Sequence, residues 1–272
     1  MAFDNTGYPI AAIQTFGCFT KIWNEAWRFE RMMHDIPEIE HKHVDLLQQL
    51  PNPAQYSDYG LVINLFDADE KGIGEAISAN STQNTGQFPL NIYLGESNYP
   101  ERHADFPFSR GNPTFILQKQ SNAPSCEEDA TENGNACSDS RKTQTLPIST
   151  SASQWMMNSV IDISMPILVG GLICLDLADI KQVFHDMGYG RYSSIEFPNY
   201  EYHKIILGDD IGFPHSVYMS IVFNEEIGLA HVNNCAEAIA KQLPENANII
   251  FSANPTPYDT GLTRIGVFTN GR

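Results

Sequence analysis

The chain has 272 residues, 42% of them hydrophobic, which is enough for one large domain or two modest domains with real cores. Its formal net charge of −17 and its pI of about 4.7 argue against general nucleic-acid binding and against docking to anionic membranes. No stretch approaches the roughly 18 apolar residues of a membrane-spanning helix, and the N-terminus lacks the basic and apolar regions of a secretion signal. The five cysteines are scattered without a Cys-x-x-Cys pair, which is typical of a reducing, cytoplasmic compartment.

The first predicted elements are a strand, a glycine turn and a helix. Residues 9–15 form a short apolar run typical of a buried strand, and residues 21–34 carry apolar side chains at helical spacing. A strand, a glycine turn and a helix bind phosphate in many nucleotide-binding folds. Here Phe16 and Phe19 flank Gly17, and their bulk keeps a phosphate away from the backbone. We therefore interpret this turn as structural.

Three histidines follow in an acidic segment. His34, His41 and His43 lie among Asp and Glu residues, and a His-x-His pair beside acids is one arrangement of metal ligands. The segment also has the pattern of a polar helix with a solvated face. We therefore expect no metal site here.

An apolar strand over residues 61–66 is followed by an acidic loop that contains glycine. The loop, residues 67–74, has the sequence DADEKGIG. Three carboxylates oppose the binding of a nucleotide phosphate by like charge, and Lys71 alone cannot offset them. A bound divalent cation would offset them, but the spacing of the acids does not demand one.

The rest of the N-terminal half contains further strands and a low-complexity segment. We expect a short polar helix over residues 75–83 and strands over residues 88–95 and 113–119. Residues 122–153 are rich in Ser, Thr, Asn, Asp and Glu, and we expect them to form a disordered linker or an exposed insertion. Cys126 and Cys137 share this segment and can pair under oxidation.

A long apolar helix, a short loop and a second helix come next. Residues 155–168 are apolar at helical spacing, with Asp162 as their only charge, and a glycine pair ends the run. Asp176 or Asp179 opens a second helix over residues 177–187. An aspartate at a helix start accepts hydrogen bonds from free backbone N–H groups and complements the helix dipole.

The C-terminal part has the pattern of a small α+β unit. Its predicted elements are an extended segment at 189–197, a short helix at 200–207, a strand at 216–224, an amphipathic helix at 225–243 and strands at 246–254 and 263–269.

Two separate stretches resemble the FtsZ/tubulin superfamily. Residues 170–188, GGLICLDLADIKQVFHDMG, resemble the family's synergy loop G-x-x-N-x-D-F-x-D-V and the helix after it, which ends in Met-Gly. Cys174 replaces the family's Asn, and Leu177 replaces its Phe. Residues 245–271, ENANIIFSANPTPYDTGLTRIGVFTNG, follow the pattern N-A-x-I-I-F-G, an acidic turn, and I-R-V-T-V-I-A-T-G. The resemblance covers residues 155–271 well and the N-terminal half as a strand-and-helix pattern.

The resemblance implies an α/β fold. It consists of a shortened Rossmann-like FtsZ/tubulin N-terminal domain, a central core helix and an α+β C-terminal domain with a mixed sheet. The implied units are a degenerate nucleotide-binding-like domain over 1–121, the linker or insertion over 122–153, the central helix and synergy loop over 154–188, and the C-terminal domain over 189–272.

The resemblance also implies roles for individual residues. In the family, the acids of the synergy loop reach into the GTP site of the next subunit and position the attacking water. By resemblance this role falls on Asp176 and Asp179, and the alternative is that both only cap their helix.

The implied nucleotide pocket is degenerate. Its residues would be Gly17, Gly72, Gly74 and Gln154. Gln154 lies near the position from which the family reads the guanine edge, or is simply a helix-start residue. The family's phosphate loop G-G-G-T-G-T-G is replaced by the acidic residues 67–74, so we expect no cofactor, with GTP disfavoured, and no GTPase activity of the chain's own.

Three functions are compatible with these patterns. The first is a non-hydrolysing FtsZ-like cytoskeletal protein that assembles with FtsZ-type filaments, or with its own kind, and donates Asp176 and Asp179 in trans. The second is a weak GTP-binding paralogue that polymerises itself. The third is an adapter on the same scaffold without a filament role. We expect FtsZ-like subunits or the chain itself as partners, with neither nucleic-acid binding nor membrane insertion.

Overall fold

The structure is a computed structural model. It describes residues 11–17, 40–44, 59–82, 90–97, 112–118, 152–185, 187–202, 205, 207, 214–224, 226–256 and 261–270. The helix predicted over residues 21–34, residues 122–151 of the predicted insertion and the pair Cys126 and Cys137 lie outside these ranges.

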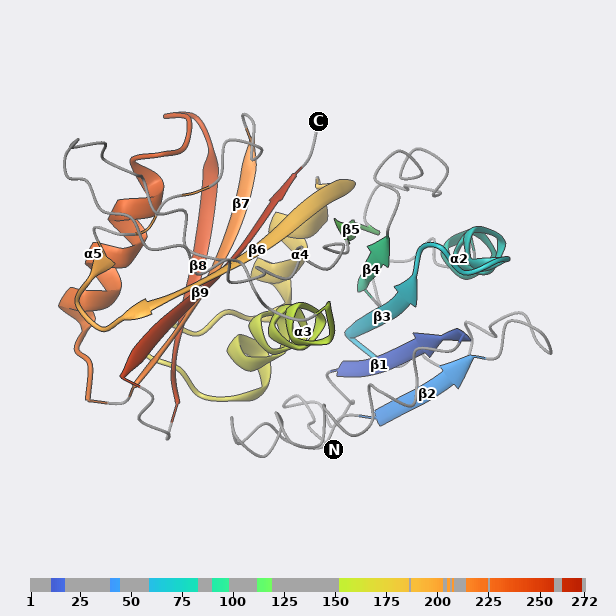
Figure 1. Ribbon diagram of the computed structural model, residues 1–272, viewed down its shortest axis with the longest axis horizontal. Helices are drawn as coiled ribbons and strands as arrows, with labels where there is room; N and C mark the ends of the chain where they lie inside the picture. The colour runs from blue at the N-terminus through green and yellow to red at the C-terminus, as the bar shows by residue number, and fades with distance from the viewer. Residues whose placement is uncertain are drawn as a thin grey trace, which may run out of the picture.

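The strands of the described residues form one mixed sheet of nine strands in the order β2-β1-β3-β4-β5-β6-β9-β7-β8 (Figure 1). The strands are β1 (Ala11–Phe16), β2 (Glu40–Val44), β3 (Leu61–Asp67), β4 (Leu90–Ser97), β5 (Thr114–Gln118), β6 (Tyr189–Pro198), β7 (Ser216–Asn224), β8 (Asn248–Thr256) and β9 (Leu262–Asn270). All pairs from β2 to β6 are parallel, whereas β9 runs antiparallel to both of its neighbours, β6 and β7. The fold therefore has a parallel half and a mixed half, as predicted.

The parallel half is covered by helices on both faces. The helices are α2 (Ile73–Thr82), α3 (Ala152–Leu168), α4 (Leu177–His185) and α5 (Leu229–Ala240). β3 is buried at each of its first six residues, which is why its sequence is a nearly continuous apolar run and not an alternating one. α2 packs on one face of this half through Ile73, Ala76 and Ile77, and α3 packs on the other.

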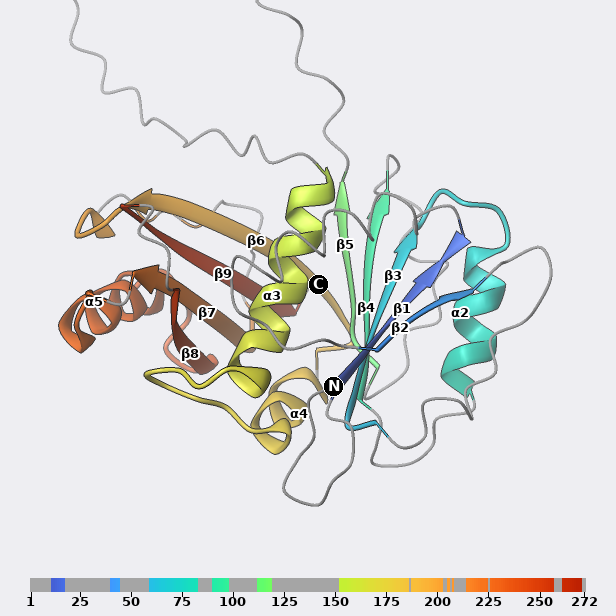
Figure 2. The same cartoon turned by 90° about the horizontal axis from the view of Figure 1, so that it is seen from below.

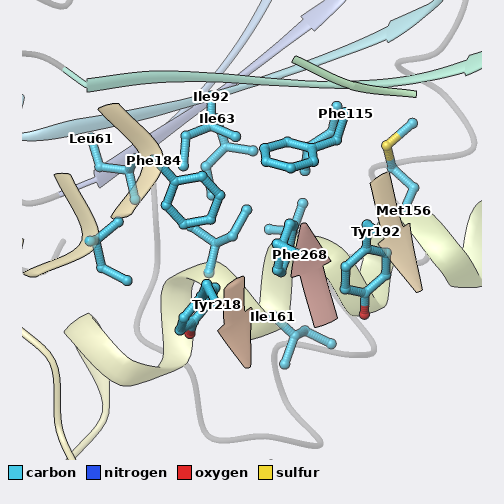
Figure 3. Close-up of a cluster of buried hydrophobic side chains, with 14 of the residues drawn as sticks. Leu61, Ile63, Ile92, Phe115, Met156, Ile161, Phe184, Tyr192, Tyr218 and Phe268 are labelled. Carbon is cyan, nitrogen blue, oxygen red and sulfur yellow. The ribbon is translucent and has the colours of Figure 1, made fainter. Parts of the chain in front are cut away.

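α3 lies between the two halves of the sheet (Figure 2). One buried cluster contains side chains from β1, β3 and β4 on one side of α3 and from β6, β7 and β9 on the other. Figure 3 shows the centre of this cluster, where the rings of Phe115, Phe184 and Phe268 meet edge to face. The indole N–H of Trp155 on α3 donates to the backbone oxygen of Tyr192 on β6 at 3.1 Å. α3 is therefore the shared core of both halves, which explains why its sequence is apolar on most sides.

The mixed half is a sheet between α5 on one face and α3 with α4 on the other. Val232, Cys235 and Ile239 of α5 are buried against β7, β8 and β9. β7, α5 and β8 form a strand-helix-strand unit in which the two strands are parallel. None of the helices in the described ranges is long and apolar enough to span a membrane.

Most predicted elements are confirmed, and one local prediction is wrong. Residues 40–44, which contain His41 and His43, form strand β2 and not a polar helix, because pairing with the edge of β1 overrides their polar composition. Of the short helix predicted over residues 200–207, Tyr200 lies in a turn with φ of 69° and Tyr202 is in a 3₁₀ helix, while residues 203, 204 and 206 lie outside the described ranges. A left-handed residue interrupts a helix, and the backbone N–H of Asn199 instead donates to Gly261 O at 3.0 Å.

Candidate functional site

The acidic loop after β3 lies at the carboxyl edge of the parallel sheet. Its shape is fixed by its own acids: the backbone N–H of Asp69 donates to Asp67 Oδ1 at 2.9 Å, and the hydroxyl of Ser97 donates to Asp69 Oδ1 at 3.0 Å. The backbone N–H of Ala68 donates to the backbone oxygen of Glu96 on β4 at 2.7 Å. An aspartate that accepts from the N–H two residues later stabilises a tight turn. The carboxylates therefore have a structural role in holding this loop in place.

The Glu70 carboxylate lies directly on the backbone of Gly17, in the turn that follows β1. Gly17 has φ of 67°, and a Cβ atom at this position would overlap the carboxylate. β1 and β3 are parallel neighbours, so their carboxyl ends meet at one edge and a side chain from one loop reaches the other. The backbone at Gly17, at the carboxyl end of β1, thus already has an anion of the chain itself against it.

The other predicted pocket residues lie around the same loop and at the start of α3. Gly72 has φ of 85° and its backbone oxygen accepts from Ala76 N at 3.1 Å, so the loop ends where α2 begins. Gly74 lies in the first turn of α2. The Gln154 side chain is on the first turns of α3 and donates to Asn158 Oδ1 at 3.1 Å. Within the part of the chain that the structure describes, no group of three or more His, Cys, Asp or Glu side chains is arranged to hold a metal ion.

Asp176 and Asp179 form a reciprocal cap at the start of α4. The backbone N–H of Asp179 donates to Asp176 Oδ1 at 2.8 Å, and the backbone N–H of Asp176 donates to Asp179 Oδ2 at 3.1 Å. This is the geometry of a capping box, in which the first and fourth residues satisfy each other's free N–H groups. Asp176 is exposed and Asp179 is partly exposed, and each carboxylate uses one oxygen in the cap. Both aspartates therefore cap α4, and this geometry leaves one oxygen of each carboxylate outside the cap.

The acid pair and the predicted pocket lie at opposite ends of α3. α3 has 17 residues and spans about 25 Å at the usual rise per residue. Its N-terminal end lies at the carboxyl edge of the parallel strands, and its C-terminal end leads to the loop before α4 (Figure 2). Within one subunit, Asp176 and Asp179 therefore cannot reach the turn that holds Gly17.

The loop between α3 and α4 is attached to the edge strand β8. The backbone N–H of Leu172 donates to Ala253 O at 2.8 Å, and the N–H of Ala253 donates to Ile173 O at 3.1 Å. The loop is closed on itself by the Gly171 N–H, which donates to Cys174 Sγ at 3.1 Å. Cys174, which replaces the Asn of the FtsZ pattern, thus has a structural role in this loop.

A buried charge pair links α3 to the mixed half of the sheet, and the sequence did not predict it. Asp162 Oδ2 accepts from Arg264 Nη1 at 2.8 Å and from the Tyr192 hydroxyl at 2.5 Å. Burial raises the pKa of the Asp162 carboxyl, against the opposing effect of the Arg264 guanidinium. The one available signal was Asp162 itself, a single acid in an otherwise apolar helix.

Comparison with solved structures identifies the fold. The structure of an FtsZ W319Y mutant from M. jannaschii matches with a TM-score of 0.66 at 14% sequence identity, over 98% of this chain and 92% of that chain. An empty FtsZ dimer from M. jannaschii matches with a TM-score of 0.64 at 15% identity, over 96% of this chain and 88% of that chain. No protein-family profile and no curated protein sequence matches the chain. The chain therefore has an FtsZ-like fold, and the α/β architecture predicted from the sequence is confirmed.

Proposed function

We propose that this chain is a nucleotide-free FtsZ-like subunit that assembles with filaments of a GTP-hydrolysing FtsZ or regulates them. The observation that carries the proposal is the Glu70 carboxylate on the backbone of Gly17, in the turn where a phosphate would be held. A carboxylate and a phosphate cannot both lie against the same turn, because the two anions repel each other and would occupy the same space. Asp67 and Asp69 add negative charge at the same edge of the sheet. On this account GTP is not a cofactor of the chain, and the chain is not itself a GTPase.

The position of the acid pair supports a role in trans. Asp176 and Asp179 lie at the opposite end of α3 from the Gly17 turn, so they meet a nucleotide only in a neighbour stacked head to tail. One of the FtsZ structures named above is a dimer, which supports assembly of this fold with itself. In such a stack the chain donates its two carboxylates to the neighbour's GTP and accepts no nucleotide in return. The expected result is co-assembly or capping of one filament end.

The capping geometry also favours a second candidate. If the reciprocal hydrogen bonds between Asp176 and Asp179 are the only role of these residues, the chain is an adapter on an FtsZ-like scaffold without a filament role. The two candidates differ in one measurable property. It is whether the negative charges of Asp176 and Asp179 are needed to change a partner's GTP turnover when the helix cap itself is preserved.

The experiment measures GTP turnover of an active FtsZ with and without this chain at equal concentration. The informative variant is Asp176→Ser with Asp179→Gln, because Ser and Gln rebuild the capping box without either charge. The proposal predicts that the wild-type chain changes turnover and that the variant does not. Glu237→Ala is the matched control, since Glu237 is an exposed acid on α5 and its removal should leave the effect intact.

Circular dichroism melting must first show that the Ser/Gln variant is folded as well as wild type. If the variant then changes FtsZ turnover as much as wild type does, the carboxylates have no chemical role and the adapter is favoured. If the wild-type chain has no effect on turnover at any ratio, donation in trans is refuted.

A further inference from the structure

Buried polar side chains connect α3 to the loop that carries the acid pair. The Tyr218 hydroxyl on β7 donates to the backbone oxygen of Asp162 on α3 at 2.6 Å. It lies 3.1 Å from the hydroxyl of Ser252 on β8, and the Asn254 amide Nδ2 donates to that Ser252 hydroxyl at 3.3 Å. Tyr218, Ser252 and Asn254 are all fully buried.

The direction of each hydrogen bond in this relay follows from the chemistry of the groups. A backbone oxygen only accepts, so Tyr218 uses its single proton on Asp162 and must accept from Ser252. Ser252 in turn uses its single proton on Tyr218 and must accept, and the Asn254 amide is its donor. The relay therefore has one consistent arrangement, in which the amide nitrogen of Asn254 faces Ser252.

The far end of the relay is the backbone of the loop. A Cβ atom at Gly171 would lie 2.6 Å from Asn254 Oδ1 and 2.7 Å from Ala253 O, so the loop backbone rests directly on the Asn254 side chain. Asn254 Oδ1 has no hydrogen-bond partner among the described residues although it is buried. Burying an amide whose oxygen has no hydrogen-bond partner lowers the stability of the fold, and an apolar side chain at this position would avoid that loss.

We propose that Asn254 is a positioning residue for Asp176 and Asp179. Ser252 and Tyr218 hold the Asn254 side chain in one orientation. The side chain then sets the distance between strand β8 and the loop backbone at Gly171, five residues before Asp176. The backbone pairing of Leu172 and Ile173 with Ala253 then carries this position along the loop to the start of α4. The consequence for a partner's GTP turnover depends on the proposed function, whereas the effect on the loop does not.

The test is amide hydrogen exchange, read by mass spectrometry, on the full-length chain. In Asn254→Ala we expect exchange of residues 172–179 at least tenfold faster than in wild type, while the amides of α5 exchange unchanged. Tyr218→Phe, which removes the relay hydroxyl with almost no change of volume, should accelerate the same residues to a smaller extent. Asn64→Ala is the matched control, because Asn64 is a fully buried asparagine on β3 of the same sheet whose amide donates to Val62, Asn91 and Ile92 and not to the relay.

A purely structural role would give a different pattern. General destabilisation would accelerate α5 and residues 172–179 together, and that result, or unchanged exchange of the loop in both variants, overturns the proposal. Acceleration confined to the loop supports it.

The same variants in the GTP-turnover assay separate this inference from the proposed function. A loosened loop in Asn254→Ala together with no effect of the wild-type chain on FtsZ refutes the function and keeps the positioning role. The opposite outcome has three parts: the wild-type chain changes turnover, the Ser/Gln variant of the acid pair abolishes this change, and Asn254→Ala alters neither turnover nor loop exchange. That outcome refutes the positioning role and keeps the function.

Discussion

Removing the buried acid of α3 should strongly destabilise the fold. Asp162 is fully buried, and Arg264, which donates to it at 2.8 Å, is almost fully buried on β9. Asp162→Ala removes the carboxylate that accepts from the guanidinium and leaves only Glu196, opposite Arg264 on β6, as a negative neighbour among the described residues. It also removes the acceptor of the Tyr192 hydroxyl. Breaking a buried pair by removing one partner costs about 3–5 kcal/mol of unfolding free energy. At about 2–4 °C per kcal/mol for a chain of this size, the melting temperature should fall by about 6–20 °C.

A double variant shows whether the loss comes from the unpaired charge. Asp162→Leu combined with Arg264→Met replaces both charges by apolar groups of similar size, and such replacements are often neutral or stabilising. We therefore expect the double variant to be more stable than Asp162→Ala by at least about 2 kcal/mol in urea unfolding followed by circular dichroism. If Asp162→Ala lies within about 1 kcal/mol of wild type, or if the double variant is no more stable than the single one, the reasoning about this pair is wrong.

Two further predictions concern titrating side chains of the mixed half. Burial raises the pKa of the Cys235 thiol from 9.0 to about 12, so at pH 8 its thiolate fraction is about a thousandfold lower than that of an ordinary thiol. A thiol reagent at pH 8 should therefore modify the exposed Cys174 and leave Cys235 unmodified in the folded chain. Peptide mass spectrometry reads the result, and equal modification of both would contradict it. Burial lowers the pKa of His231 from its ordinary 6.5. The unfolded chain therefore protonates this histidine at a higher pH than the folded chain does, and the free energy of unfolding decreases as the pH falls below about 6.5. His231→Gln should therefore show a shallower loss of stability between about pH 7 and 5 than wild type in urea unfolding, and identical slopes would rule this histidine out as a cause.

The elements that sequence analysis predicts well are those whose pattern reflects burial. β3 is apolar at nearly every position because it is covered on both faces, and α3 is apolar because both halves of the sheet pack on it. The start of α4 was also predictable, since an aspartate pair three residues apart before an apolar run is a local capping pattern.

What the sequence could not predict depends on contacts between distant parts of the chain. The position of Glu70 on Gly17 requires that β1 and β3 are neighbours, which no local pattern shows. Arg264 meets Asp162 across 102 residues. The residues of β2 are locally polar and become a strand only because the edge of β1 offers them backbone partners.

Isothermal titration with GTP and with GDP, with and without Mg²⁺, tests the central claim most directly. At about 0.1 mM protein, a dissociation constant below about 10⁻³ M would give measurable heat. The account predicts no heat for either nucleotide, because the Glu70 carboxylate already occupies the Gly17 turn. Binding in the micromolar range would contradict it and would make a self-polymerising GTP-binding protein the better account.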